Sequence, residues 1–545
     1  MQSDKYSNTR FSRPEPLARG SSFSRIKLSQ HQIIFLGVGL LGFGMYLWQL
    51  TVPVFLQLYD SGVYSAAAIH FVSGELPYKD FVFVQPPGIL LIMSPVALFS
   101  RVFGSHDGFI FARVVSAFVT ALDASLLTWL VRHRGRLAMV LAGTGLALTP
   151  VAVFFSSGVR LEPYCICLVL LGSLRIFSSN GEDGELTTKS LAIGGLLFGL
   201  AALVEFWAFF PFIALMTYLV TRCHKRVLIF IGAAGGGFAA VALPFFLASP
   251  NNFVSEVFVE QLSRPGGSRS VLWRLIDMTG LSGTSIAPTA EEAVLAFAAF
   301  SIVIAFAYQQ RLGHEGVDVF LLLAAPMTVI GLLAAPTAYT DYSYFAAPFL
   351  FGLLGISMAR LEPAARRLAN SVPISKTLRK FVAVLSALAG SLLIAALVLY
   401  VTSFYSIGER LYGTSAGSIS QITSHIPAGS CVVYSEVGVG VLANRLQSSN
   451  PHCPSVVDPV GVSMAWGYEL TSPAPGFIST WRAYFRAAQY VVVENPLIGS
   501  QFNAGSSSYR SLLPWNRSLT TWFSNHYHLV FGQFALYIYE KNSPA

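Results

Sequence analysis

The feature that most constrains this chain is a succession of long apolar runs between residues 33 and 403. A membrane-spanning helix needs about 20 mostly apolar residues, and most of the runs approach that length. Only 11% of the 545 residues are charged, whereas a soluble domain usually carries about a quarter. The sequence therefore predicts an integral membrane protein with many helical spans. The runs lie at 33–55, 88–103, 108–131, 137–157, 163–177, 190–206, 207–221, 227–248, 291–309, 317–335, 342–359 and 381–403.

Basic residues between the runs predict which ends of the helices face the cytoplasm. Lys and Arg concentrate in cytoplasmic loops, so Arg132–Arg136, Arg222–Arg226 and the segment 360–380 are expected inside. Residues 1–30 are polar and basic and lack the apolar core of a signal peptide, and we expect them to form a disordered cytoplasmic tail. The net charge of +8 is therefore a topology signal, and no nucleic-acid partner is expected.

These orientations fix how the first runs cross the membrane. If the N-terminus is inside, run 33–55 crosses outward and Asp60 lies outside. Run 108–131 must then end inside, which leaves run 88–103 as a re-entrant or interface-lying helix on the outer side. The apolar stretch 190–221 is too long for one helix and contains Pro211, so we expect two helices there.

This count predicts a multi-pass protein of the cell membrane with about eleven crossings in a domain spanning residues 31–404. Its C-terminus is extracytoplasmic. In the alternative topology, run 88–103 crosses and 190–221 is one bent helix, which would expose Arg132–Arg136 outside. The first topology gathers four polar segments on the outer face: the first loop 56–107, the turn 156–162, the outer loop 249–290 and the turn 337–341. Asp123 lies inside a span, where we expect it to pair with a neighbouring helix.

The character of the chain changes after residue 405. Apolar runs shorten to strand length and alternate with helix-like stretches, which predicts an extracytoplasmic α/β domain over residues 405–545. Gly532-Gln533 is the expected hairpin turn near its end. Cys431 and Cys453 are predicted to form a disulfide, with two buried thiols as the alternative. Strands are expected at 431–434, 490–493, 529–531 and 534–539, and helices at 415–426, 477–488 and 516–527.

Short motifs in the first outer loop resemble those of the GT-C glycosyltransferases. They are Asp60 at the start of the loop, then Tyr78, Gln85-Pro86-Pro87-Gly88, Phe103-Gly104 and Arg113. The nearest group is the protein O-mannosyltransferase-like one, which includes the lipid A aminoarabinose transferases. The resemblance covers most of residues 33–360 in layout. It implies transfer of a sugar, mannose or a pentose, from a polyprenyl-phosphate donor to a hydroxyl of a glycan, lipid or protein acceptor, with inversion at the anomeric carbon.

Asp60 is the residue that this resemblance assigns to catalysis. An acceptor hydroxyl is a poor nucleophile and needs a base within hydrogen-bond reach. The lipid phosphate that leaves is already a weak base, so it needs positive charge nearby rather than a general acid. The alternative role for Asp60 is to cap a helix that starts at Ser61, and one residue can do both.

Glu162 matches the position of a second acidic residue in the family. It could bind the acceptor, or it could help Asp60 hold a divalent cation such as Mg²⁺ or Mn²⁺, since these ions prefer oxygen ligands. Arg160 beside it could contact the donor phosphate. The alternative for both is a helix start, where Glu162 and Pro163 would be favourable residues.

Further candidates for substrate binding lie in the other outer segments. Asp80 could bind sugar or only orient the first loop. Arg264 and Arg269 could grip the lipid phosphate, or they could simply reach the membrane surface. Glu205 departs from the family pattern, because relatives often carry Lys in the matching stretch, and no phosphate contact carries over to a carboxylate. Tyr64, Asp341 and Tyr342 complete the set of candidate substrate contacts.

Two other classes of function compete with an enzyme. A multi-pass lipid or sugar transporter or flippase would tend to show internal repeats and polar groups at the membrane midplane. This sequence shows no repeat, and its carboxylates gather at one face. A scaffolding subunit whose outer domain binds a partner would not need carboxylates at two separate outer turns.

Overall fold

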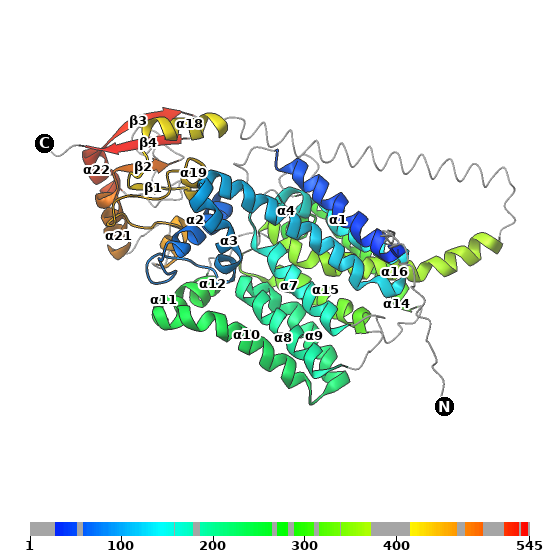
Figure 1. Cartoon of the computed structure of the whole chain (residues 1–545). Coiled ribbons are helices and arrows are strands. Elements are labelled where there is room, and N and C mark those ends of the chain that lie inside the picture. Colours follow the sequence, from blue (N-terminus) through cyan, green and yellow to red (C-terminus); the bar gives the residue numbers. More distant parts are fainter. Residues whose placement is uncertain are drawn as a thin grey trace, which may run out of the picture.

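The structure, a computed structural model, describes residues 28–51, 58–156, 158–177, 186–263, 270–281, 288–309, 316–337, 339–371, 415–465, 475–493, 517–533 and 536–542. The predicted run 381–403 and nearly all of the predicted N-terminal tail lie outside these residues. Figure 1 shows a helical part with the C-terminal domain packed against one end of it, beside α2 and α3.

The helical part is made largely of apolar helices. Its helices are α1 (Gln30–Gln49), α2 (Leu58–Val72), α3 (Gly88–Phe103), α4 (Ser105–Leu130), η2 (Arg132–Arg134), α5 (Arg136–Leu148), α6 (Pro150–Phe155), α7 (Leu161–Ile176), α8 (Thr188–Val204), η3 (Phe206–Ala208), α9 (Phe209–Cys223), α10 (Val227–Ala248), α11 (Pro250–Val254), η4 (Ser255–Val259), α12 (Glu260–Ser263), α13 (Val271–Met278), α14 (Ala290–Gln309), α15 (Gly316–Ala334), η5 (Thr340–Tyr342) and α16 (Ser343–Ser371).

Six stretches of the described chain are helical, long and apolar enough to cross a membrane. Three shorter helices, α3, α5 and α8, are also apolar. The fold is thus that of a multi-pass membrane protein, and the number of about eleven crossings stays a prediction. The six stretches are Gln30–Gln49, Ser105–Leu130, Phe206–Cys223, Val227–Ala248, Gly316–Ala334 and Thr340–Leu361.

The two ends of α3 lie on the same side of the molecule. At its start, Gly88 packs so tightly on the end of α8 that an added Cβ would lie 2.5 Å from the carbonyl oxygen of Leu203. At its end, Gly104, whose φ of 94° favours glycine, contacts Asn444 of the C-terminal domain. The helix therefore starts against the end of α8 and ends against the C-terminal domain, and its expected place on the outer side of the membrane stays a prediction.

One expectation about the helical part is confirmed and one is wrong in detail. The stretch 190–221 forms two helices, and the break between them at Glu205, whose backbone is extended, falls close to the expected boundary between runs 190–206 and 207–221. The segment 249–290, expected to be a loop, contains the short helices α11 to α13 and the π-helical turn η4. Part of this segment packs on the first loop, where Asn252 of α11 donates to the Tyr78 carbonyl (2.7 Å) and the Phe83 amide donates to Glu256 of η4 (2.8 Å).

The end of the helical part opposite the C-terminal domain is basic. Asp318 is completely buried there and accepts hydrogen bonds from Arg134 (2.5 Å) and Arg360 (2.7 Å). These bonds join the turn after α4 to α15 and α16. Within the membrane-spanning part, Asp123 of α4 accepts a hydrogen bond from the Tyr344 hydroxyl of α16 (2.9 Å), which is the predicted pairing with a neighbouring helix.

The C-terminal domain is built on a four-stranded sheet with strand order β1-β2-β4-β3. Strands β1 and β2 are parallel, and β4 is antiparallel to both of its neighbours. Trp481, Phe485 and Phe523 of α21 and α22 are buried in the core of this domain. Its elements are α18 (Ser415–His425), β1 (Val432–Tyr434), α19 (Val437–Leu442), α20 (Pro459–Ala465), α21 (Pro475–Ala487), β2 (Tyr490–Val493), α22 (Arg517–His526), β3 (Tyr527–Gln533) and β4 (Leu536–Lys541).

The predicted α/β alternation is found, but the hairpin turn was misplaced. Gly532 and Gln533 belong to β3, and Gln533 pairs with Leu536 of β4. Strand pairing therefore extends past the glycine that suggested a turn. Cys431 and Cys453 are joined by a disulfide across 22 positions of the chain.

Removing this disulfide is expected to lower the stability of the C-terminal domain. Replacing both cysteines with serine should cost about 3 kcal/mol, the loss of loop constraint for a closed loop of this length. The measurement is thermal unfolding of the full chain, together with thiol alkylation of the unreduced protein. Two alkylated thiols at Cys431 and Cys453 before reduction would contradict the disulfide.

Candidate functional site

A polar cavity of about 390 Å³ opens between the helical part and the C-terminal domain. Five carboxylates and a single arginine stand among the described residues that line it. This excess of acidic groups is unusual in a buried site and marks the cavity as the candidate active site. The lining residues are Tyr59, Asp60, Val63, Tyr64, Val84, Gln85, Phe155, Arg160, Leu161, Glu162, Glu205, Tyr339, Thr340, Asp341, Tyr342, Asp458 and Val460.

Asp60 lies in the first turn of α2, with its side chain 41% exposed to the cavity. Because α2 already begins at Leu58, Asp60 is not the cap of a helix starting at Ser61. The buried hydroxyl of Ser61 accepts a hydrogen bond from the Val159 amide (2.9 Å) and donates to the Val159 carbonyl (3.2 Å). These two bonds fasten α2 to the turn before α7 and bring Asp60 beside Arg160.

Arg160 lies between two carboxylates. The same terminal nitrogen of its guanidinium donates to Asp60 and to Asp341, the latter at 3.2 Å. Burial opposes the charged form, but the two carboxylates outweigh it and raise the pKa of Arg160, which is therefore always protonated. Its buried Nε has no hydrogen-bond partner among the described residues, so this nitrogen can donate a hydrogen bond to a further anionic group.

Glu162 lies in the first turn of α7 and is only 5% exposed. Burial, with the nearby charge of Asp341, raises the pKa of Glu162, while Arg160 acts in the opposite direction. The raised pKa favours the neutral, protonated form of Glu162.

Aromatic side chains form one wall of the cavity. The Tyr342 ring lies 5.4 Å from Trp207 and meets Tyr339 edge-to-face at 5.3 Å. Tyr64 is buried across from them, and burial, followed by the charge of Asp60, raises the pKa of Tyr64, so that its hydroxyl stays neutral. Aromatic faces beside a few polar groups are typical of sites that hold small polar ligands.

Arg274 of the segment 249–290 has a structural role. Its guanidinium donates to the carbonyls of Leu333 (3.1 Å) and Pro336 (3.3 Å) and so satisfies the end of α15. Asp277, one turn later, accepts from the Thr340 hydroxyl (3.4 Å). Helix α13 thereby fixes the turn that carries Asp341. Arg264 and Arg269, the predicted phosphate contacts, lie outside the described residues.

The structure does not bring Asp80 to the cavity. Its carboxylate accepts the Leu76 amide (2.7 Å), which fits the alternative that Asp80 orients the first loop. The predicted metal pair stays a prediction. Asp60 bonds to Arg160, and no group of three or more His, Cys, Asp or Glu side chains in the described part of the chain is arranged to hold a metal. No chemical step is assigned to a metal ion.

Two carboxylates of the cavity were not among the predicted site residues. In the sequence, Glu205 stands out as a departure from the family pattern, and a lone carboxylate between two apolar runs could have marked it as a site residue. Asp458 comes from the C-terminal domain, and its sequence surroundings gave no such signal, because only the docking of the domain brings it to the cavity.

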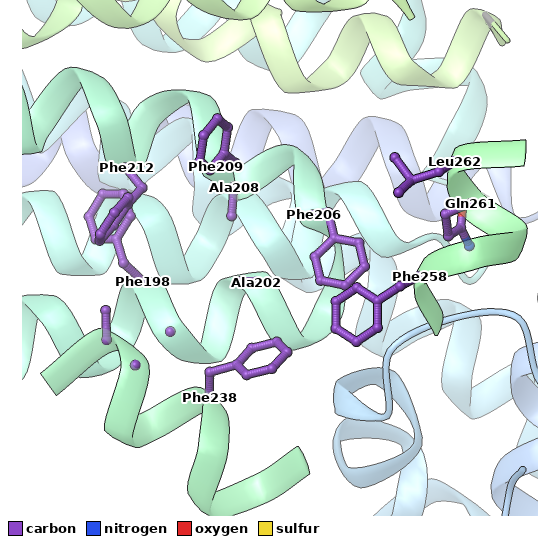
Figure 2. A pocket seen from close by; sticks show the side chains of 13 residues that line it. Phe198, Ala202, Phe206, Ala208, Phe209, Phe212, Phe238, Phe258, Gln261 and Leu262 are labelled. Carbon is purple, nitrogen blue, oxygen red and sulfur yellow. The ribbon is translucent and has the colours of Figure 1, made fainter. Parts of the chain in front are cut away.

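A second, apolar groove of about 440 Å³ lies beside the cavity, between α8, α9, α10 and α12. Figure 2 shows its phenylalanine side chains, with the stacked rings of Phe206 and Phe258 near the end where Gln261 lies. The Gln261 amide is 3.3 Å from the side-chain oxygen of Gln85, which lines the polar cavity. The apolar groove therefore ends next to the polar cavity.

No family model matches the sequence, and no curated protein matches it significantly. The fold is similar to that of solved membrane transferases. Crystal structures of ArnT from Cupriavidus metallidurans, bound to undecaprenyl phosphate and in the apo state, match at TM-scores of 0.57 and 0.56 with 13% and 14% identity, over 93% of this chain and 97% of theirs. The apo oligosaccharyltransferase of Archaeoglobus fulgidus matches at a TM-score of 0.50 and 14% identity, over 93% of this chain and 73% of that one. The chain thus shares the fold of these structures, which is the predicted arrangement of a polytopic helical bundle followed by an α/β domain.

Proposed function

We propose that this protein is an inverting glycosyltransferase of the cell membrane, with Asp60 as the general base. It moves a sugar, mannose or a pentose, from a polyprenyl-phosphate donor to a hydroxyl of a glycan, lipid or protein acceptor. The observation that carries this proposal is the polar cavity with Asp60 and Arg160, which adjoins an apolar groove. The similarity to an ArnT structure bound to undecaprenyl phosphate supports the same class of donor.

The orientation in the membrane is part of the proposal. The basic turn Arg132–Arg134 lies at the end of α4 far from the C-terminal domain, whereas Ser105 at the start of α4 donates to the Val441 carbonyl of that domain (2.6 Å). Basic loops face the cytoplasm, so the cavity and the C-terminus are extracytoplasmic and the N-terminus is cytoplasmic.

Arg160 would bind the donor phosphate. The transfer breaks the bond between the anomeric carbon and a phosphate oxygen, and negative charge grows on that phosphate as it leaves. The permanently charged guanidinium, with its unpartnered Nε, can stabilise this charge. The phosphate competes with Asp60 for the guanidinium, so donor binding would also loosen the bond that occupies Asp60.

Asp60 would activate the acceptor. Once Arg160 turns to the phosphate, the carboxylate can take the proton of an acceptor hydroxyl as its oxygen attacks the anomeric carbon. Attack from the face opposite the leaving phosphate inverts that carbon. Tyr64, Tyr342, Glu162 and Asp341 line the remaining walls and would hold the sugar and the acceptor.

The groove would hold the first isoprene units of the donor lipid, and filling it tests the proposed donor class. Gly235 lines the groove, and a Cβ there would meet nothing within 4 Å, so Gly235→Leu fills it without a clash. We expect a rise of about tenfold or more in the KM for a long-chain polyprenyl-phosphate sugar, since burial of a few CH₂ groups is lost. A donor whose chain is too short to reach Gly235 should be affected much less. The measurement is transfer kinetics with donors of both lengths.

The same helix offers a matched control. Gly232 of α10 also has open space around it but does not line the groove, so Gly232→Leu adds the same side chain elsewhere. It should leave both KM values unchanged. Equal effects of the two variants, or no effect of Gly235→Leu, would contradict a lipid chain in the groove.

A further inference from the structure

The C-terminal domain contributes a carboxylate to the cavity and bonds it to the residue next to Asp60. The Tyr59 hydroxyl donates to Asp458 (2.6 Å) and accepts from the Val460 amide (2.9 Å). Asp458 also accepts from the Gly461 amide (2.8 Å) and is only 5% exposed. These bonds connect positions about 400 residues apart in the chain, within the wall of the cavity itself.

One turn further along α2, a second contact holds the same segment. A Cβ added to Gly62 would lie 2.5 Å from the Cα and the amide nitrogen of Gly438 in α19, so the two backbones touch without side chains between them. Asp60 therefore stands between two points, Tyr59 and Gly62, at which α2 is fastened to the C-terminal domain. Ser61 fastens the same turn to Val159 on the other side.

From these contacts we propose that Asp458 is a positioning residue for the reaction. Through Tyr59 it fixes the first turn of α2 and so sets the direction in which the Asp60 carboxylate points into the cavity. The C-terminal domain is then part of the catalytic apparatus, because α2 is correctly placed only when the domain is docked. The effect on transfer rests on the proposed function, whereas the effect on α2 does not.

A purely local role for Asp458 makes a different prediction. As the residue before α20, it could serve only to cap that helix through its bond to the Gly461 amide. In that case the loss of the Tyr59 hydroxyl would change nothing. Tyr59→Phe removes that hydroxyl alone, so it distinguishes the capping role of Asp458 from the positioning role. Because the ring stays in place, this variant should not unfold the C-terminal domain.

The experiment compares four variants of the full-length protein in lipid nanodiscs: Tyr59→Phe, Asp458→Ala, Asp458→Asn and the double variant Tyr59→Phe/Asp458→Ala. We expect kcat to fall about 10- to 100-fold in both of the first two, as for a misplaced catalytic group, with the KM for the donor unchanged. The double variant should be no slower than the worse single variant, because both break one connection. Asp458→Asn keeps an acceptor oxygen and should retain most of the activity.

Amide hydrogen exchange over residues 58–64, measured without substrate, gives a readout that needs no activity. Exchange should rise in Tyr59→Phe and Asp458→Ala and stay at the wild-type level in Asp458→Asn. Gly62→Ala should raise it too, whereas Gly44→Ala, in open space on α1, should not. Multiplicative losses in the double variant, or unchanged exchange in Tyr59→Phe, would overturn the proposal. A wild-type protein without transferase activity would instead refute the proposed function, and the exchange data would still decide this inference.

Discussion

Asp60→Asn is expected to lower the rate of sugar transfer by about 10²- to 10⁴-fold, the usual contribution of a general base. Asparagine has the same shape but cannot take a proton from the acceptor hydroxyl. Donor binding should persist or tighten, because Arg160 no longer has the Asp60 carboxylate as a competitor for the phosphate. The measurement is single-turnover transfer from a labelled lipid-linked sugar in proteoliposomes, with donor binding determined separately.

Asp80→Asn is the matched control, because it makes the same change in the same loop outside the cavity. An asparagine there can still accept the Leu76 amide, so both the fold and the transfer rate should stay close to those of the wild type. If Asp60→Asn transferred sugar at the wild-type rate, Asp60 would not be the base. If Asp80→Asn were equally slow, the loss would come from disturbance of the first loop.

The sequence alone predicted that Asp60, Arg160, Glu162 and Asp341 belong together. Run lengths and basic loops predict how many times the chain crosses the membrane between two residues. An even number of crossings places residues that are about a hundred positions apart at the same end of the bundle. The structure brings all four to one cavity. The number of crossings cannot predict which of these four side chains bond to one another. The bond that occupies Asp60 with Arg160 depends on how Ser61 fastens α2 to Val159.

Two of the misses share a physical cause. Helices α11 to α13 and the contribution of Asp458 both depend on contacts between segments far apart in the chain. Examples are the hydrogen bond from the Phe83 amide to Glu256 and the one from the Tyr59 hydroxyl to Asp458. No local sequence pattern predicts such bonds. The hairpin turn was misplaced for the opposite reason, since a local Gly-Gln signal was outweighed by strand pairing that continued to Gln533.

Arg160→Ala is expected to destabilise the helical part as well as to abolish transfer. The guanidinium is the one cation among the described residues lining the cavity, and without it Asp341 and the buried Glu162 have no counter-charge from a residue of that lining. Breaking a buried ion pair in this way costs about 3–5 kcal/mol. Arg160→Lys should restore part of the stability but little of the transfer, because an ammonium lacks the planar fork that grips a phosphate.

The pH dependence of stability distinguishes the loss of the positive charge of Arg160 from a simple loss of packing. Burial raises the pKa of Glu162, so the folded chain binds more protons than the unfolded chain. The free energy of unfolding therefore falls as the pH rises above the pKa that Glu162 has in the unfolded chain. Arg160 acts against this shift, so its removal raises that pKa further and extends the fall to higher pH. The deficit of Arg160→Ala relative to the wild type should therefore be small at pH 5 and large at pH 8 in thermal unfolding. Arg136→Ala, at an exposed arginine outside the cavity, should show no deficit at either pH. An equal deficit of Arg160→Ala at both pH values would mean that Arg160 stabilises the fold by packing on Phe155 rather than by compensating the carboxylates.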